Sequence, residues 1–210
     1  MDYSIKFWDR IAEKYAKKPV ADEATYQKKL DVTKSYLQLH MKALEFGCGT
    51  GSTALALAPY VREYEAIDVS PKMIAITQQK LAVKPIPNLT FKQTPLEEYP
   101  VPEGSLDVVL GHSILHLLND PEATIQRVYQ MLKPGGIFIS STACLADGMV
   151  ILRIIAPLGK WLRLIPPVRV FSRVELEASL SSTGFRIDYR LVHDKNRMSC
   201  FLVAVKPESH

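Results

Sequence analysis

Apolar residues recur with two different periods along the chain, and the change of period separates its regions. Residues 1–40 carry apolar side chains at helical spacing, which predicts a helical cap of two helices broken near Pro19. Residues 41–141 switch five times between short apolar runs and amphipathic stretches. Such alternation is typical of parallel strands linked by helices that cover both faces of the sheet. The pattern therefore predicts an α/β core with a ligand site beyond the carboxyl ends of its strands.

The C-terminal stretch, residues 172–210, has the pattern of a helix followed by two strands. Ser172 and Glu175 have the spacing of a capping box, which predicts a helix start, and Gly184 is expected to end that helix. Two apolar runs follow, separated by the polar segment 193–197. The pattern predicts a closing β-hairpin.

Residues 142–171 form a basic, apolar insertion between these two regions. Within 149–171, the basic residues Arg153, Lys160 and Arg163 fall on one narrow face if the segment is helical. Three interpretations remain open. The segment could be an ordinary amphipathic helix in the core or in a dimer interface, a lid or wall for a lipophilic substrate, or a peripheral contact with a membrane surface.

Composition predicts one compact domain spanning residues 1–210. The hydrophobic content of 47% can fill a sizeable core, and the net charge of +4 is scattered. No lysine or arginine block with interleaved aromatics predicts a nucleic-acid groove. The three cysteines form no C-x-x-C or Cys/His cluster, so neither a disulfide framework nor a metal site is expected. Without a signal-peptide pattern or a membrane-spanning run, a cytoplasmic monomer or homodimer is expected.

A glycine-rich turn follows the apolar strand 43–46 and leads into an alanine-rich stretch. Gly47, Gly49 and Gly51 alternate with other residues, and glycine can take positive φ and let a ligand approach the backbone. The dinucleotide fingerprint G-x-G-x-x-G needs a third glycine where this chain has Ser52. The turn therefore indicates a nucleotide-like ligand other than a nicotinamide dinucleotide.

An acidic residue ends the next predicted strand. Asp68 lies 21 residues after Gly47, at a position where a carboxylate can accept hydrogen bonds from both hydroxyls of a ribose. Ser70 and Pro71 follow as the expected N-cap and first residue of a helix. Asp68 is thus the predicted ribose-binding residue.

These motifs, in this order, resemble those of class I S-adenosylmethionine (SAM) dependent methyltransferases, in the branch that includes quinone-biosynthesis and phospholipid or sterol methyltransferases. The resemblance implies a Rossmann-like three-layer sandwich, with a seven-stranded, mostly parallel sheet and an antiparallel last strand. It is carried by the W-D-x-x-A-x-x-Y pattern at 8–15, the E-x-G-x-G-x-G turn at 45–51, D-x-S-x-x-M-I at 68–74, the segment 91–107, and L-K-P-G-G at 132–136.

The resemblance also implies which residues hold SAM and, after transfer, S-adenosylhomocysteine. Relatives often place an aspartate against the adenine amino group where this chain has Pro95, so only the location carries over, and backbone groups near Leu96 are expected to contact adenine. The implied cofactor-binding set is Glu45, Phe46, Gly47, Cys48, Gly49, Gly51, Asp68, Val69, Met73, Pro95, Leu96 and His112.

Three residues are candidates for catalysis of methyl transfer to a small, lipophilic or amphiphilic acceptor. His112 and His116 follow the fourth predicted strand, where a histidine can take a proton at neutral pH if the acceptor arrives protonated. Tyr15 corresponds to the family's tyrosine that closes over the amino-acid end of SAM. Two other hypotheses remain: a SAM-binding sensor or partner module without turnover, and an NAD-linked oxidoreductase, which Ser52 disfavours.

Overall fold

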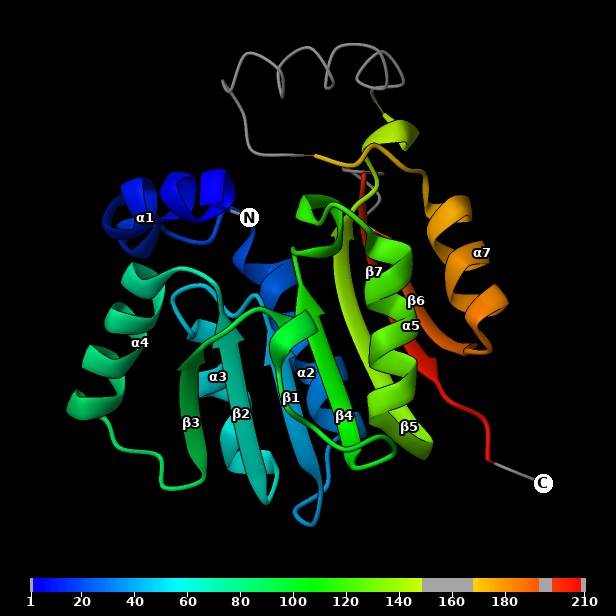
Figure 1. Ribbon diagram of the computed structural model, residues 1–210, viewed down its shortest axis with the longest axis horizontal. Helices are drawn as coiled ribbons and strands as arrows, with labels where there is room; N and C mark the ends of the chain where they lie inside the picture. The colour runs from blue at the N-terminus through cyan, green and yellow to red at the C-terminus, as the bar shows by residue number, and fades with distance from the viewer. Residues whose placement is uncertain (1, 149–167, 193–197, 209–210) are drawn as a thin grey trace. The chain divides into compact units, whose positions relative to one another are not determined.

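The computed structural model describes residues 2–148, 168–192 and 198–208. Seven strands form a sheet of order β3-β2-β1-β4-β5-β7-β6 (Figure 1). Strand β7 is antiparallel to both β5 and β6. The predicted Rossmann-like fold, with a mostly parallel sheet and an antiparallel last strand, is confirmed. The chain clusters into two compact units, residues 1–100 and 101–210, which are described in turn.

The first unit contains three parallel strands, with β2 paired to both β1 and β3. The predicted N-terminal helices form, and strands and helices then alternate as expected. Its elements are α1 (Asp2–Lys17), α2 (Glu23–Tyr36), β1 (Lys42–Phe46), α3 (Ser52–Leu57), η1 (Ala58–Tyr60), β2 (Glu63–Asp68), α4 (Pro71–Val83), β3 (Leu89–Gln93) and η2 (Leu96–Glu98).

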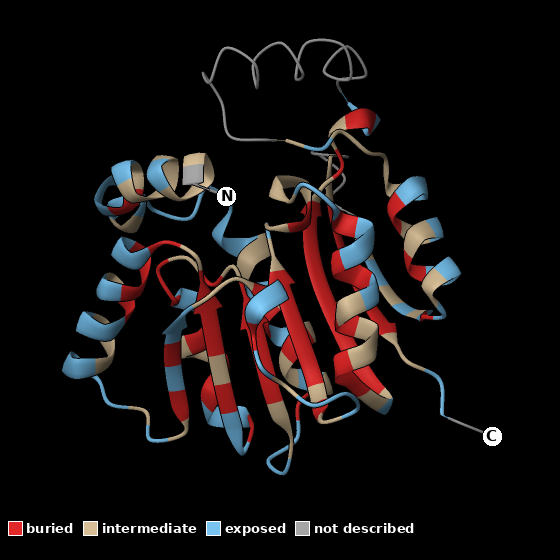
Figure 2. Ribbon diagram, in the orientation of Figure 1, coloured by how far each residue is buried: buried red, intermediate tan, exposed pale blue. Residues whose placement is uncertain are grey.

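Buried strand centres and one helix cap explain how the end of β2 meets the start of α4. Leu44, Tyr64 and Ala66 are fully buried, and the strands are coloured as buried along their middle (Figure 2). Helix α4 begins directly after β2 because the Ser70 hydroxyl accepts a hydrogen bond from the Met73 amide at 3.1 Å. The short connection places the end of β2 next to the start of α4.

The second unit contains the remaining four strands. Helix α5 is drawn in front of them in Figure 1, with α7 beside it. The predicted capping box between Ser172 and Glu175 is present, and Gly184 ends α7 with a φ of 109°. Its elements are β4 (Leu106–His112), η3 (Leu115–Leu117), α5 (Pro121–Met131), β5 (Leu132–Ala143), η4 (Leu145–Asp147), α7 (Arg173–Thr183), β6 (Arg186–Val192) and β7 (Ser199–Val205).

Strand β5 begins at Leu132, so the L-K-P-G-G segment 132–136 lies within it. The pairing with β4 moves from Leu132 to Ile137 across an irregularity that contains Gly135, with a φ of 75°. Residues 149–167 of the insertion and the hairpin loop 193–197 lie outside the described residues. The three interpretations of the insertion and the single-domain organisation therefore stay predictions.

Candidate functional site

The turn after β1 has the conformation that its glycines predict. Gly47, Gly49 and Gly51 have φ values of 65°, 52° and 74°, all in the left-handed region that favours glycine. The Cys48 amide donates to the Ile67 carbonyl at 3.1 Å, which fixes the turn against the end of β2. The turn thus lies beside the strand that ends in the predicted ribose-binding acid.

Gly51 has a second role, in packing. A Cβ atom at this position would lie 2.8 Å from the Thr77 Cγ2 atom and 2.9 Å from the Phe91 ring. Real Cβ atoms essentially never approach so closely. Gly51 therefore permits the contact between the start of α3 and the elements α4 and β3.

Replacing Gly51 by alanine is expected to lower the free energy of unfolding by about 2 to 4 kcal/mol, because backbone strain and a clash act together. Gly104 is the matched control: its φ is 60°, but nothing lies within 4 Å of a Cβ placed there. Gly104→Ala is expected to cost about 1 to 2 kcal/mol, the strain alone. Urea unfolding of both variants measures the difference, and equal losses would show that the clash at Gly51 is relieved.

Asp68 ends β2 and is only 8% exposed. Its two carboxylate oxygens accept hydrogen bonds from the Gly49 amide at 2.9 Å and the Ser70 amide at 2.8 Å. Burial raises the pKa of Asp68, and these backbone bonds oppose the rise. Because each carboxylate oxygen has two lone pairs, the bonds from Gly49 and Ser70 do not exhaust the acceptor capacity of the carboxylate. The geometry thus fits the predicted ribose-binding role.

Glu45 is the penultimate residue of β1 and is almost fully buried beside the same turn. The Tyr64 phenol donates a hydrogen bond to Glu45 Oε2 at 2.8 Å. Burial raises the pKa of Glu45 to about 8; the Tyr64 bond lowers it and the charge of Asp68 raises it further. Glu45 is therefore mostly protonated at neutral pH. A cationic group placed nearby would favour its ionised form.

The residues expected near adenine adjoin the end of β2. The Thr94 amide donates to the Asp68 carbonyl at 3.1 Å, which brings the segment containing Pro95 and Leu96 beside Asp68. Met73 and Leu96 are buried, and Val69 and Pro95 are half-buried. The structure thus brings these residues into one region of the first unit. Their contact with adenine stays a prediction.

Tyr15 lies on α1 close to the glycine turn. Its Cε1 atom is 3.9 Å from the position that a Cβ of Gly49 would take. The Tyr15 ring also meets Trp8 in an edge-to-face contact with a centroid distance of 6.1 Å. Tyr15 remains 46% exposed, so its side chain is not part of the buried core.

The second unit contains the two candidate histidines. His112 ends β4, opposite Ser141, and its ring stacks on Phe201 with an interplanar angle of 3°. Ser113 follows with a φ of 55°, the one non-glycine residue with positive φ in the described part of the chain. Such strained conformations persist where the surrounding structure fixes them and are enriched at functional sites. The sequence contains no signal for this strain.

His116 lies in η3, close behind His112. Burial lowers its pKa to about 4, so its imidazole is neutral at physiological pH. Its Nδ1 atom is buried with no hydrogen-bond partner within the described residues, and its carbonyl accepts from the Arg169 amide at 2.8 Å. A histidine with so low a pKa is a weak base at neutral pH.

Tyr64 and Asp9 are not among the predicted site residues, although the Tyr64 phenol donates to Glu45 and Asp9 accepts from the Ser70 hydroxyl. Cys48, Cys144 and Cys200 are free and buried. Within residues 2–148, 168–192 and 198–208, no group of three His, Cys, Asp or Glu side chains is arranged to hold a metal ion. Over the same ranges, no helix is long and apolar enough to cross a membrane.

Comparison with known proteins identifies the domain. Residues 44–140 match the family profile described as a methyltransferase domain. The uncharacterized methyltransferase YcgJ of Bacillus subtilis is 31% identical over 98 residues, which cover 47% of this chain and 39% of that protein. A crystal structure of YcgJ has a TM-score of 0.71 at 19% identity, covering 87% of this chain and all of that one.

Two further relatives have more specific names. A probable S-adenosylmethionine-dependent methyltransferase of Mycolicibacterium smegmatis is 27% identical over 69% of this chain and 52% of its own length. The demethylmenaquinone methyltransferase of Symbiobacterium thermophilum is 28% identical over 65% of this chain and 57% of its own length. The chain thus spans roughly 39 to 57% of these curated relatives. The predicted resemblance to methyltransferases is confirmed for residues 44–140, and the predicted fold is shared with methyltransferases of known structure.

Proposed function

We propose that the chain is a SAM-dependent methyltransferase that acts on a small, lipophilic or amphiphilic acceptor. The observation that carries the proposal is the joint geometry of the glycine turn and Asp68. The Gly49 amide donates to Asp68 at 2.9 Å, so the turn and the acid form one edge of a ligand site. A turn that admits a ligand to the backbone, next to a carboxylate with free acceptor capacity, suits a nucleoside with a charged tail.

The chain's residues would hold and orient SAM. Bound SAM supplies a methyl group on a sulfonium, which an acceptor attacks in line while the carbon–sulfur bond breaks to leave S-adenosylhomocysteine. Asp68 would accept from the ribose hydroxyls, Tyr15 would cover the amino-acid end, and Glu45 would face the positively charged part of the ligand. Orientation and exclusion of water are the main contributions that such a displacement requires.

A general base is needed only for an acceptor that arrives protonated. Between the two histidines, the low pKa of His116 makes it a weak base at neutral pH, so the role falls to His112, which ends β4. The Nδ1 atom of the neutral, buried His116 would accept a hydrogen bond from the substrate that is methylated. Tyr15 is the third candidate.

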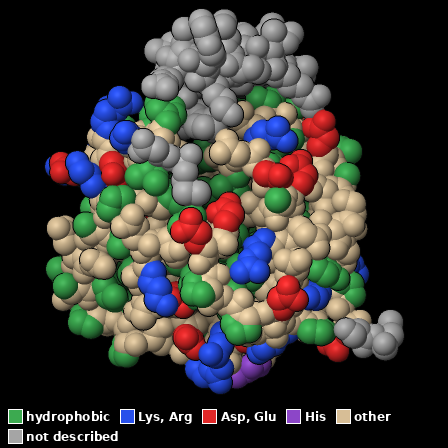
Figure 3. Space-filling view, viewed as in Figure 1, with side chains coloured by type: hydrophobic (Ala, Val, Ile, Leu, Met, Phe, Trp, Pro, Cys, Tyr) green, Lys and Arg blue, Asp and Glu red, His purple; other side chains and the backbone are tan. Residues whose placement is uncertain are grey.

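The acceptor class rests on two observations. A relative is named for demethylmenaquinone, a lipophilic acceptor, and the insertion that could cover such a molecule is rich in apolar residues, although most of it lies outside the described residues. Acidic and basic side chains of the described residues intermingle on the visible face in Figure 3, so these residues form no single-sign patch for a polyanion there. A SAM-binding module without turnover is the alternative.

Calorimetric titration with SAM, S-adenosylhomocysteine and NAD, followed by product detection over quinols, fatty amines, phospholipids and catechols, tests the proposal. We expect the first two ligands to bind, NAD not to bind, and one acceptor class to be methylated. Binding without turnover would favour the sensor module. Failure of SAM to bind, or binding of NAD in its place, would contradict the proposed cofactor.

A further inference from the structure

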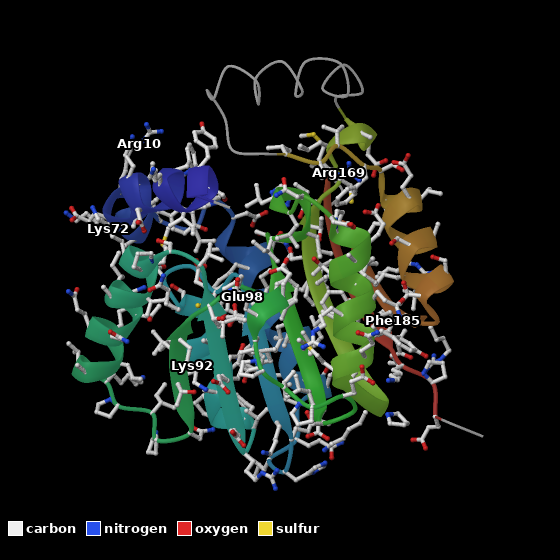
Figure 4. The ribbon with its side chains drawn as sticks, viewed as in Figure 1. Arg10, Lys72, Lys92, Glu98, Arg169 and Phe185 are labelled. Carbon is white, nitrogen blue, oxygen red and sulfur yellow. The ribbon has the colours of Figure 1, made fainter. Side chains whose placement is uncertain are left out.

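One carboxylate joins α1 to the first turn of α4. The Ser70 hydroxyl donates to Asp9 Oδ1 at 2.5 Å, and the Lys72 amide donates to the same oxygen at 3.3 Å. Figure 4 labels Lys72 at the start of α4, with α1 and Arg10 alongside. These hydrogen bonds therefore join the two helices, which are also in contact.

Ser70 uses its hydroxyl in both hydrogen-bonding roles. It is fully buried, accepts from the Met73 amide as the N-cap of α4, and gives its single proton to Asp9. Asp9 thus places a negative charge at the N-terminus of α4, where the helix dipole favours it. The Ser70–Asp9 bond therefore ties α1 to the first turn of α4.

The same serine continues the connection to the candidate SAM site. The Ser70 amide donates to one oxygen of Asp68, and the Gly49 amide donates to the other. Hydrogen bonds therefore run from Asp9 through Ser70 and Asp68 to the glycine turn. The negative charge of Asp9 also raises the pKa of Asp68, although less than burial does. Two like charges this close repel each other, so the hydrogen bonds of Ser70 offset an electrostatic cost.

The position of α1 determines where Tyr15 stands. Tyr15 lies further along the same helix than Asp9, and its ring is 3.9 Å from the Cβ position of Gly49. Trp8, next to Asp9, contacts the Tyr15 ring edge to face. A helix held at Asp9 therefore keeps Tyr15 against the glycine turn.

We propose that Asp9 is a positioning residue for the SAM site: by bonding the first turn of α4, it holds α1 so that Tyr15 covers the glycine turn and slows the release of SAM. This inference rests on the proposed function, since it needs SAM at that turn. Asp9 itself touches no reacting atom.

The test measures SAM dissociation by stopped flow in single and double variants. Asp9→Ala is expected to release SAM about tenfold faster than wild type. The release rate of Asp9→Asn should lie between those of Asp9→Ala and wild type, because the amide oxygen of asparagine still accepts from Ser70. Tyr15→Ala should have a similar effect. The Asp9→Ala/Tyr15→Ala pair should release SAM no faster than either single variant, because both changes remove one interaction. Glu13→Gln, which changes an exposed acid of α1, is the control and should match wild type.

Amide hydrogen exchange of residues 2–17 in the ligand-free protein gives a readout independent of SAM. Faster exchange in Asp9→Ala, but not in Glu13→Gln, is expected. Unchanged exchange would overturn the role of Asp9 in holding α1. Two results would overturn the role of Asp9 in positioning Tyr15. One is faster amide exchange of α1 in Asp9→Ala with an unchanged rate of SAM release. The other is a double variant whose increase in the release rate is the product of the two single increases. If wild type binds no SAM, the proposed function fails, while the exchange experiment still tests the contact with α4.

Discussion

Asp68→Ala is expected to weaken SAM binding tenfold to hundredfold or more, about 1.5 to 3 kcal/mol, because hydrogen bonds from the ribose to a charged acceptor are lost. The Gly49 and Ser70 amides lose their acceptor as well. The free energy of unfolding should therefore also fall, by about 1 to 3 kcal/mol, since donors in a buried setting are left without partners. Calorimetry with SAM and urea unfolding measure the two effects separately.

The Asp68→Asn variant distinguishes geometry from the mere presence of an acceptor. Asparagine has one acceptor oxygen and one donor group, whereas Gly49 and Ser70 each present a donor to a different oxygen of Asp68. One of the two amides would then face an N–H group. We expect Asp68→Asn to lose nearly as much SAM affinity as Asp68→Ala, although it keeps the size of the side chain.

Glu63→Gln is the control on the same strand, because Glu63 is exposed and its partner is Lys42, away from the glycine turn. It should bind SAM as wild type does. Unchanged SAM affinity in Asp68→Ala, with the fold intact by circular dichroism, would refute the assignment of Asp68.

Local sequence signals account for most of the fold and for the backbone of the site. Glycine at alternate positions predicts a left-handed turn, and Gly47, Gly49 and Gly51 all have positive φ. Ser70 and Ser172 precede helices with the residue chemistry of N-caps, and both caps form. These features depend on residues a few positions apart, so a pattern in the sequence is enough to predict them.

The hydrogen bonds that tune the site depend on distant residues and leave no such pattern. Tyr64 bonds Glu45 across 19 residues, and Asp9 bonds Ser70 across 61. Tyrosine on a strand and aspartate on an amphipathic helix are ordinary residues for those positions. Only the packing of β1 on β2, and of α1 on α4, gives these side chains their partners.

Two backbone irregularities, at Ser113 and at the start of β5, could not be predicted from the sequence for a different reason. Ser113 takes a φ of 55° although serine has no preference for that region, so tertiary contacts such as the bond from its amide to Ser141 must impose it. The L-K-P-G-G segment predicts a turn, yet pairing with β4 resumes at Ile137 and includes it within β5. In both places tertiary pairing overrides local preference.

Glu45→Gln is expected to remove a pH dependence of stability. The pKa of Glu45 is about 8 in the folded chain against a usual 4.5, so between these pH values the folded state retains a proton that the unfolded state releases. The favourable contribution of protonated Glu45 is thus complete below pH 4.5 and is lost as pH rises through about 8. The shift corresponds to about 5 kcal/mol, so the unfolding free energy of wild type should fall by several kcal/mol relative to Glu45→Gln between pH 5 and 9.

Urea unfolding of both proteins at unit steps of pH measures this difference, and Glu63→Gln, which alters an exposed acid of β2, should show none. A constant difference between wild type and Glu45→Gln over that range would mean that Glu45 ionises near its usual pKa.

Proton release on SAM binding offers a second measurement. If the positive end of SAM approaches Glu45, ionisation becomes favourable, and wild type should release a proton on binding at pH 7. The calorimetric enthalpy should then depend on the ionisation enthalpy of the buffer, and Glu45→Gln should lose most of that dependence.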